Sequence, residues 1–276
     1  MPDQPLAVLG GGNMGRALIS GLVRAGTPPA QIRVGEASAA ARRALERELG
    51  VSASAENTRA IDGAAVVVLA VKPQQAAAVV TELGPLLRAQ RPLLLSVAAG
   101  VRISSLEAWC GAGVPVARAM PNRPALLGAG VTALYAPPSV GSGLRAAAEG
   151  IARAVGELVW VSTEDLLDVV TALSGSGPAY FFLLAELMAE AGAGLGLAEP
   201  VAKRLAAATL HGAGLMAAAA DADLARLRAE VTSKGGTTEA ALGVFASADL
   251  RGTVARALQA ATRRGRELGA AAEYRS

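Results

Sequence analysis

Short apolar runs of strand length alternate with stretches of helical periodicity from Leu6 to about Thr163. This alternation is typical of an α/β domain in which helices connect parallel strands. The run at residues 66–71 is apolar without alternation, which predicts a central strand covered by helices on both faces. The runs expected to form strands are Leu6–Leu9, Ile32–Val34, Val66–Val71, Leu93–Val97, Val114–Met120 and Leu158–Val161.

The chain changes character near Thr163. Beyond this residue the apolar positions recur with a helical period, and no further strand is expected. Pro178 and Pro200 each precede such a stretch, at a place where the first turn of a helix tolerates proline. We therefore predict an α/β fold with an N-terminal, doubly wound and mostly parallel sheet of the Rossmann type over residues 1–163, followed by an all-α domain over residues 164–276.

The composition narrows the class of protein. Hydrophobic residues make up 52% of the 276 residues, enough to bury a sizeable core, whereas aromatic residues make up only 3%. With few aromatic and many small side chains, helices can approach one another closely. The 26 Lys and Arg exceed the 23 Asp and Glu by a net charge of only +3 and are scattered along the chain, so we expect no nucleic acid partner.

Two further features bear on location. Cys110 is the one cysteine in the sequence, so no disulfide can form within the chain, and this fits a reducing, cytoplasmic compartment. Residues 1–5 carry no basic start of a signal peptide, and the apolar run that follows is soon broken by glycines. We therefore expect neither a leader nor a membrane span.

The first expected strand is followed by the turn Gly10–Gly15, which has the spacing Gly-x-Gly-x-x-Gly. In this strand-turn-helix setting one glycine permits the tight turn, another lets the backbone approach a pyrophosphate, and the third lets the helix pack on the strand. The start of the following helix offers free amide groups to the same phosphates. The turn therefore predicts dinucleotide binding through Gly10, Gly12, Asn13, Met14 and Gly15.

Glu36 lies just after the second expected strand, about twenty residues beyond the glycine turn. Its carboxylate can accept hydrogen bonds from a ribose 2′-hydroxyl, which favours NADH. Arg42 and Arg43 offer the alternative of binding a 2′-phosphate. The choice between NADPH and NADH therefore stays open.

Four further segments carry residues suited to chemistry: Ala70–Pro73, Arg118–Asn122, Leu173–Tyr180 and Val231–Thr238. In this order and spacing they resemble those of the pyrroline-5-carboxylate reductase family. The serine-glycine-proline and glycine-threonine segments are far more specific than the glycine turn. The resemblance covers nearly the whole chain.

This resemblance implies a reaction and an assembly. Members of the family reduce the cyclic imine 1-pyrroline-5-carboxylate to L-proline with NADPH or NADH, the last step of proline biosynthesis. By the resemblance, the helical domain interlocks with that of a partner subunit to form a homodimer or a larger homo-oligomer of dimers. The substrate pocket is then expected between the cofactor domain and helices of the dimer.

Reduction of an imine requires a hydride donor held against the imine carbon, a hydrogen-bonding group at nitrogen, and an anchor for the ring carboxylate. A protonated imine is already electrophilic, so no strong acid or base is required. Taken alone, the two specific segments would be an ordinary interhelical turn and an ordinary helix N-cap. The resemblance instead implies that Thr238 places its hydroxyl at the substrate nitrogen, with Ser176 as a further polar contact and Ser174, Ser233, Gly235, Gly236 and Thr237 as substrate-binding residues.

Further cofactor contacts are expected where strands end, because the carboxyl ends of parallel strands line the ligand crevice of this fold. Ala98, Ala99 and Asn122 follow expected strands and are placed beside the nicotinamide. By the resemblance, Asn57 contacts the adenosine ribose. The segment Ala70, Val71, Lys72 and Pro73 completes the set, with the lysine near the ribose or phosphate.

Two residues depart from the family pattern, in which threonine is usual at the position of Arg123 and proline at that of Lys234. Both add positive charge near the proposed site. Either they strengthen carboxylate binding or they project into solvent, and we favour the second interpretation.

Other functions stay open from the sequence. A related reductase of another small cyclic imine, or of a hydroxy or keto acid, would share the architecture. A hydroxy-acid enzyme needs a catalytic lysine or histidine, for which His211, Lys203 and Lys234 are the candidates, although His211 is better explained as a structural helix residue. A non-catalytic, cofactor-binding paralogue would explain the altered motifs. No metal site is expected.

Overall fold

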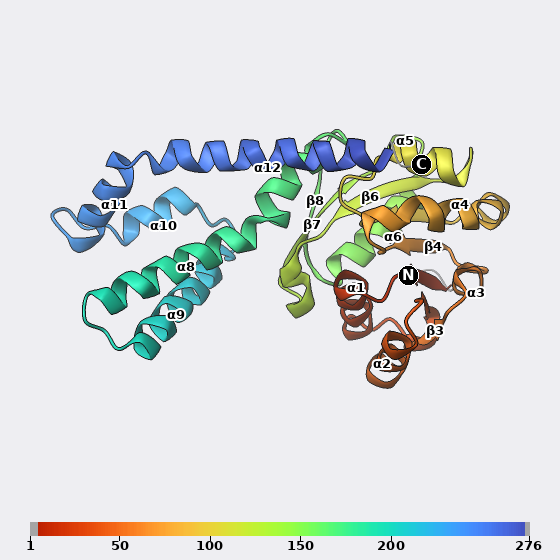
Figure 1. Ribbon diagram of the computed structural model, residues 1–276, viewed down its shortest axis with the longest axis horizontal. Coiled ribbons are helices and arrows are strands. Elements are labelled where there is room, and N and C mark those ends of the chain that lie inside the picture. Colours follow the sequence, from red (N-terminus) through yellow and green to blue (C-terminus); the bar gives the residue numbers. More distant parts are fainter. Residues whose placement is uncertain (1–4, 274–276) are drawn as a thin grey trace. The chain divides into compact units, whose positions relative to one another are not determined.

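The computed structural model describes residues 5–273, and its larger part is an eight-stranded sheet with helices on both faces (Figure 1). Residues 1–4, on which the expected lack of a leader partly depends, lie outside this range. The strand order is β3-β2-β1-β4-β5-β6-β7-β8, and it reverses at β1 and β4 as in a doubly wound fold. The strands are β1 (Leu6–Leu9), β2 (Ile32–Gly35), β3 (Ser52–Ser54), β4 (Val66–Leu69), β5 (Leu93–Ser96), β6 (Val116–Met120), β7 (Gly130–Tyr135) and β8 (Gly156–Trp160).

The predicted mostly parallel sheet is confirmed, and the apolar pattern misses two of its strands. β3 has the sequence Ser-Ala-Ser and lies at an edge of the sheet, so it lacks the apolar run of a buried strand. β7 follows a glycine-rich segment and contains Thr132, which interrupts the apolar pattern. β7 pairs antiparallel with β6 and parallel with β8, so these two last strands run opposite to the others.

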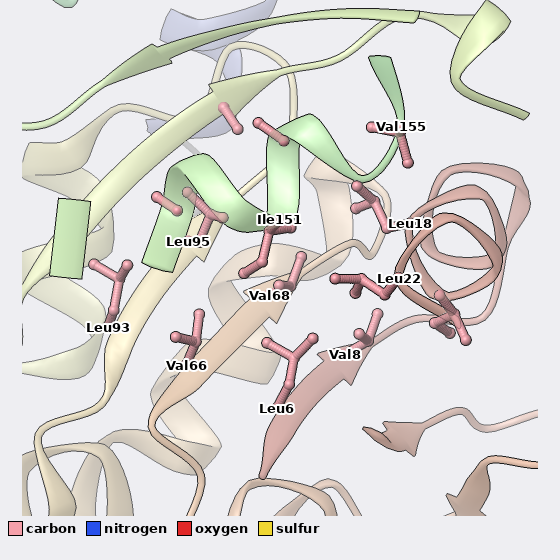
Figure 2. Close-up of a cluster of buried hydrophobic side chains, with 14 of the residues drawn as sticks. Leu6, Val8, Leu18, Leu22, Val66, Val68, Leu93, Leu95, Ile151 and Val155 are labelled. Carbon is pink, nitrogen blue, oxygen red and sulfur yellow. The ribbon is translucent and has the colours of Figure 1, made fainter. Parts of the chain in front are cut away.

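The core of the sheet unit has two layers, one on each face. Alternate residues of a strand point to opposite sides, so that Val8 belongs to one layer and its neighbour Ala7 to the other. Figure 2 shows the first layer, in which Leu18 of α1 and Ile151 of α6 face the strands. Because helices cover both faces, β4 is apolar at every position, as the sequence predicts.

Helices α1, α2 and α6 contribute to the first layer, and α3, α4 and α5 to the second. Two short 3-10 helices, η1 and η2, lie in the connections. The bounds are α1 (Asn13–Arg24), η1 (Pro29–Gln31), α2 (Ala39–Leu49), α3 (Asn57–Ile61), α4 (Pro73–Gln90), α5 (Ile103–Cys110), η2 (Arg123–Leu127) and α6 (Ser142–Arg153).

All elements in the described part of the chain after β8 are helices, as predicted. The chain divides into a compact unit that extends to Gly175 and resumes at Ala261, here called the cofactor unit, and a second compact unit, Ser176–Ala260, called the helical unit. Pro178 and Pro200 both occupy the first turn of a helix, as expected. The elements are α7 (Leu166–Val170), the π-helix η3 (Thr171–Gly175), α8 (Gly177–Gly194), α9 (Glu199–Ala217), α10 (Leu224–Glu230), α11 (Thr237–Ser247) and α12 (Leu250–Glu273).

The helical unit buries little of its apolar surface by itself. Its buried core consists of Ala189, Ala202 and Ala206, where α8 and α9 pack together. Many large apolar side chains stay exposed, including Phe181 at 61% and Leu215 at 62%. Apolar exposure on this scale marks a surface that binds another protein or a membrane.

One stretch of the described chain, Leu166–Gly194, is long and apolar enough to cross a membrane when judged by length and composition alone. Only 22% of its apolar window is buried. A single stretch of this kind is weak evidence for a span, because the core helix of a soluble protein meets the same criteria.

Candidate active site

The carboxyl ends of the four neighbouring strands β1, β4, β5 and β6 lie at one edge of the sheet, because these strands are parallel. The sequence-predicted cofactor residues follow those strand ends directly, so the fold brings them to one edge. They are Gly10, Gly12, Asn13, Met14 and Gly15 after β1, then Ala70, Val71, Lys72 and Pro73 after β4, Ala98 and Ala99 after β5, and Asn122 after β6.

The glycine turn has the geometry that a dinucleotide requires. Gly10 has a φ of 103°, and a Cβ there would lie 2.7 Å from the Ala70 carbonyl oxygen. A Cβ on Gly15 would overlap the Gly10 carbonyl oxygen, so the helix packs on the turn without a side chain. Gly12, by contrast, faces open space, and no side chain caps the amides that begin α1. The turn therefore fits a pyrophosphate, which the free amides can bind.

Glu36 lies beside this turn, at the end of β2. Its carboxylate accepts hydrogen bonds from the Gly11 amide and the Ser38 amide, each at 2.7 Å. The Arg42 guanidinium donates to the carbonyls of Glu36 and Ala37. The carboxylate is therefore held in place, and Arg42 is engaged with the backbone of the same loop.

The remaining predicted cofactor residues differ in exposure. Asn57 begins α3 and lies directly against Gly35 at the end of β2, where a Cβ would overlap its Oδ1 atom. Lys72 is exposed at the start of α4. Ala98 is buried and Ala99 is exposed.

A network of buried and partly buried charges links β6 to α5 and to the segment before α7, and the predicted site residues do not include it. Arg118 of β6 is 4% exposed and donates a 2.8 Å hydrogen bond to Glu164, whose Oε1 also accepts from the Ile103 amide. Arg102 pairs with Asp168 at 2.6 Å. Burial lowers the pKa of the Arg118 guanidinium, and the hydrogen bond to Glu164 opposes this effect. The sequence features that could have indicated this network are the acidic residues just before a helix and the arginines in or beside strands.

The first two residues of the serine-glycine turn, Ser174 and Gly175, end the π-helix η3, a rare form that occurs often at functional sites. The Thr171 hydroxyl donates to the Leu167 carbonyl, and the Ser174 hydroxyl to the Val170 carbonyl. Ser176 is partly buried and directly precedes α8.

The threonine loop lies in the helical unit, between α10 and α11. Gly236 is the N-cap of α11 and has no side chain to bond the first amides of that helix, so the amides of Thr237 and Thr238 can bind an anion. Ser233 curls over Gly236, where a Cβ would overlap its hydroxyl oxygen. The Gly235 amide already donates to Glu239 at 2.7 Å.

Four charged or titratable residues singled out by the sequence lie on surface helices and loops. Arg123 and Lys234, which depart from the family pattern, are both exposed, and so is His211 on α9. Lys203 pairs with Glu199 on the same helix. Within residues 5–273 no group of three or more His, Cys, Asp or Glu side chains is arranged to hold a metal ion.

The fold and the glycine turn define a nicotinamide-dependent oxidoreductase with a helical second domain. Residues 5–100 match the family model "NADP oxidoreductase coenzyme F420-dependent", and residues 164–268 match "Pyrroline-5-carboxylate reductase dimerisation". The chain is 44% identical to pyrroline-5-carboxylate reductase of Pseudomonas aeruginosa, over 97% of this chain and 98% of the relative. It belongs to the pyrroline-5-carboxylate reductase family, as its motifs predict.

Solved structures agree with this assignment. The chain superposes on a pyrroline-5-carboxylate reductase from Coxiella burnetii with a TM-score of 0.93 and 40% identity, covering 97% of this chain and 99% of that one. A Plasmodium falciparum pyrroline carboxylate reductase, solved with NADP bound, gives a TM-score of 0.83 at 27% identity, with 98% and 99% covered. The exposed apolar helices thus belong to a dimerisation domain, which supports a homo-oligomer.

Proposed function

We propose that this chain reduces 1-pyrroline-5-carboxylate to L-proline with NADPH or NADH, the last step of proline biosynthesis, in the cytoplasm. The observation that carries the proposal is the combination of a dinucleotide turn with an uncapped threonine loop in a chain of this family. The domain boundary that we propose lies between residues 163 and 164, with the cofactor bound before it and the substrate after it.

The threonine loop supplies the anchor and the hydrogen bond that an imine acid needs. The free amides of Thr237 and Thr238 at the start of α11 would bind the ring carboxylate, assisted by the helix dipole. The Thr238 hydroxyl would bond to the substrate nitrogen. Ser233 and Ser176 would complete the polar lining. The Gly235 amide already donates to Glu239 and the Gly236 amide to the Ser233 carbonyl, so these two amides are the weakest candidates of the set.

The nicotinamide cofactor supplies the hydride, and the chain's own task is to orient it. The first amides of α1 would bind the pyrophosphate, and the strand ends at Ala98 and Asn122 would place the reactive ring. The held carboxylate of Glu36 would accept a hydrogen bond from a ribose 2′-hydroxyl and repel a 2′-phosphate, so we propose that NADH is preferred.

A steady-state assay tests this function. The purified protein is given NADH or NADPH with 1-pyrroline-5-carboxylate or with the six-membered cyclic imine acid. We expect turnover with the five-membered ring and higher kcat/KM for NADH. Turnover only with the larger ring would assign the chain to a related imine reductase, and cofactor binding without any turnover would assign it to the non-catalytic class. Turnover with a hydroxy acid would instead point to Lys234, the candidate for that chemistry that lies in the threonine loop, since Lys203 is paired with Glu199 on α9.

A further inference from the structure

The side chain of Asn122 joins separate parts of the cofactor unit. Its Oδ1 atom accepts a 2.9 Å hydrogen bond from the Val131 amide of β7, and its Nδ2 atom donates a 3.2 Å hydrogen bond to the Ser174 carbonyl. One partner is a donor and the other an acceptor, so a flipped amide would oppose like groups and only this orientation satisfies both. With 9% of the residue exposed, Asn122 ties the end of β6 to β7 and to the π-helix.

The Ser174 carbonyl needs such a donor. In a regular helix it would accept from the N–H four residues later, but that residue is Pro178, which has no N–H. The Ala179 amide is bonded to the Ser176 carbonyl. The Asn122 amide therefore supplies the hydrogen bond that the proline removes.

The end of β6 also packs against the serine-glycine turn. A Cβ on Gly175 would lie 2.8 Å from the terminal methyl of Met120, so the methionine side chain packs directly on this glycine. Met120 ends β6, two residues before Asn122. The end of β6 thus contacts the π-helix through a hydrogen bond and through packing, immediately before Ser176.

We propose that Asn122 is a positioning residue for imine reduction, which holds the Ser174 carbonyl and so fixes the serine-glycine turn that leads to Ser176. This inference rests on the proposed function, in which Ser176 contacts the substrate. Both groups of the Asn122 side-chain amide are bonded within the protein, so this strand end would meet the nicotinamide through its backbone. Loss of the side-chain donor should therefore affect turnover and leave cofactor affinity intact.

The Asn122→Asp substitution tests this role, because it keeps an acceptor for Val131 and removes the donor to Ser174. We expect kcat to fall about tenfold, the effect of one lost hydrogen bond of about 1.4 kcal/mol, with cofactor Kd changed by less than about twofold. In a Pro178→Ala background the new N–H can donate to Ser174. There the same substitution should lower kcat by less than about threefold, since the two donors replace each other.

Two controls separate positioning from general destabilisation. Val114→Ala removes buried methyl groups elsewhere in the core and should lower Tm without lowering kcat. Hydrogen exchange in the peptide spanning residues 166–180 should rise in Asn122→Asp and not in Val114→Ala.

Several results would overturn the proposal. An equal loss of kcat with Pro178 and in the Pro178→Ala background, with none of the expected rescue, would show that Asn122 does not act through the Ser174 carbonyl. A raised cofactor Kd would show that the Asn122 side chain contributes to cofactor binding. If the wild-type protein shows no turnover, the proposed function fails and the catalytic role of Asn122 fails with it. Unchanged hydrogen exchange with a normally active wild type would refute the positioning role alone.

Discussion

The Arg118 guanidinium donates a 2.8 Å hydrogen bond to Glu164, and this bond joins β6 to the segment that leads into α7. Arg118 is 4% exposed, and the Glu164 side chain is 21% exposed. Because Glu164 also accepts from the Ile103 amide, one carboxylate connects β6, α5 and the start of the helical region. The pair lies wholly within the cofactor unit, so it orients the chain before it enters the helical unit.

Removing the arginine should destabilise the cofactor unit. Arg118→Met keeps an apolar stem of similar length but leaves Glu164 without its main partner, and we expect the free energy of unfolding to fall by about 3 kcal/mol. Urea unfolding followed by circular dichroism measures this loss. Arg226→Met breaks an exposed pair with Glu230 on α10 and should cost less than about 0.5 kcal/mol. Equal losses in the two variants would show that the buried pair has no special weight.

The strands and this charge network differ in how far the sequence predicts them. The apolar runs predict β1, β4 and β5 because a strand that is buried on both faces consists almost entirely of apolar residues. Edge strand β3 is not predicted, because its sequence of three residues contains two serines and therefore no apolar run. The Arg118–Glu164 ion pair is not predicted for a different reason. Its two residues are 46 positions apart in the sequence and come into contact only when the chain folds.

In the candidate site, too, some features can be predicted from the sequence and others cannot. Local motifs predict the glycine turn and the threonine loop, because each is built from consecutive residues whose amides begin one helix. The roles of single side chains are less local. The sequence predicts Asn122 beside the nicotinamide, and the structure adds that its amide is bonded to Val131 and Ser174, a pair of contacts that no spacing in the sequence reveals.

Two glycines of the dinucleotide turn should respond differently to alanine. Gly15→Ala places a Cβ on the Gly10 carbonyl oxygen, so we expect a loss of about 3 kcal/mol or failure to fold. Gly12→Ala meets open space at a backbone φ of −69°, so the fold should keep its Tm. The new methyl would instead obstruct the pyrophosphate and raise cofactor Kd about tenfold or more. Thermal unfolding and cofactor fluorescence titration separate the two effects, and a Gly12 variant with normal cofactor affinity would place the pyrophosphate elsewhere.

Glu36 should set the choice of cofactor. Glu36→Gln removes the charge that repels a 2′-phosphate and keeps a similar shape, so the ratio of kcat/KM for NADPH to that for NADH should rise about tenfold. Titration with NAD⁺ and NADP⁺ checks the same preference without turnover. Glu82→Gln neutralises an exposed carboxylate on α4 and serves as the control for net charge. A ratio that moves equally in both variants would show a general charge effect and not a contact at Glu36.

Thr238 should matter for chemistry and not for cofactor binding. The Thr238→Ala variant loses the hydroxyl proposed to bond the substrate nitrogen, and the dinucleotide turn, in the other compact unit, is unchanged. We expect kcat to fall about tenfold to a hundredfold with cofactor Kd unaltered, as for a hydrogen bond that strengthens in the transition state. Thr238→Ser keeps the hydroxyl at the start of α11 and should restore most of the turnover, whereas a merely structural threonine would be replaced equally well by alanine. Stopped-flow measurement of the hydride-transfer step shows whether the loss lies in chemistry. If alanine and serine variants turn over at the wild-type rate, the nitrogen is bound by another group, and the partly buried Ser176 is the next residue to change.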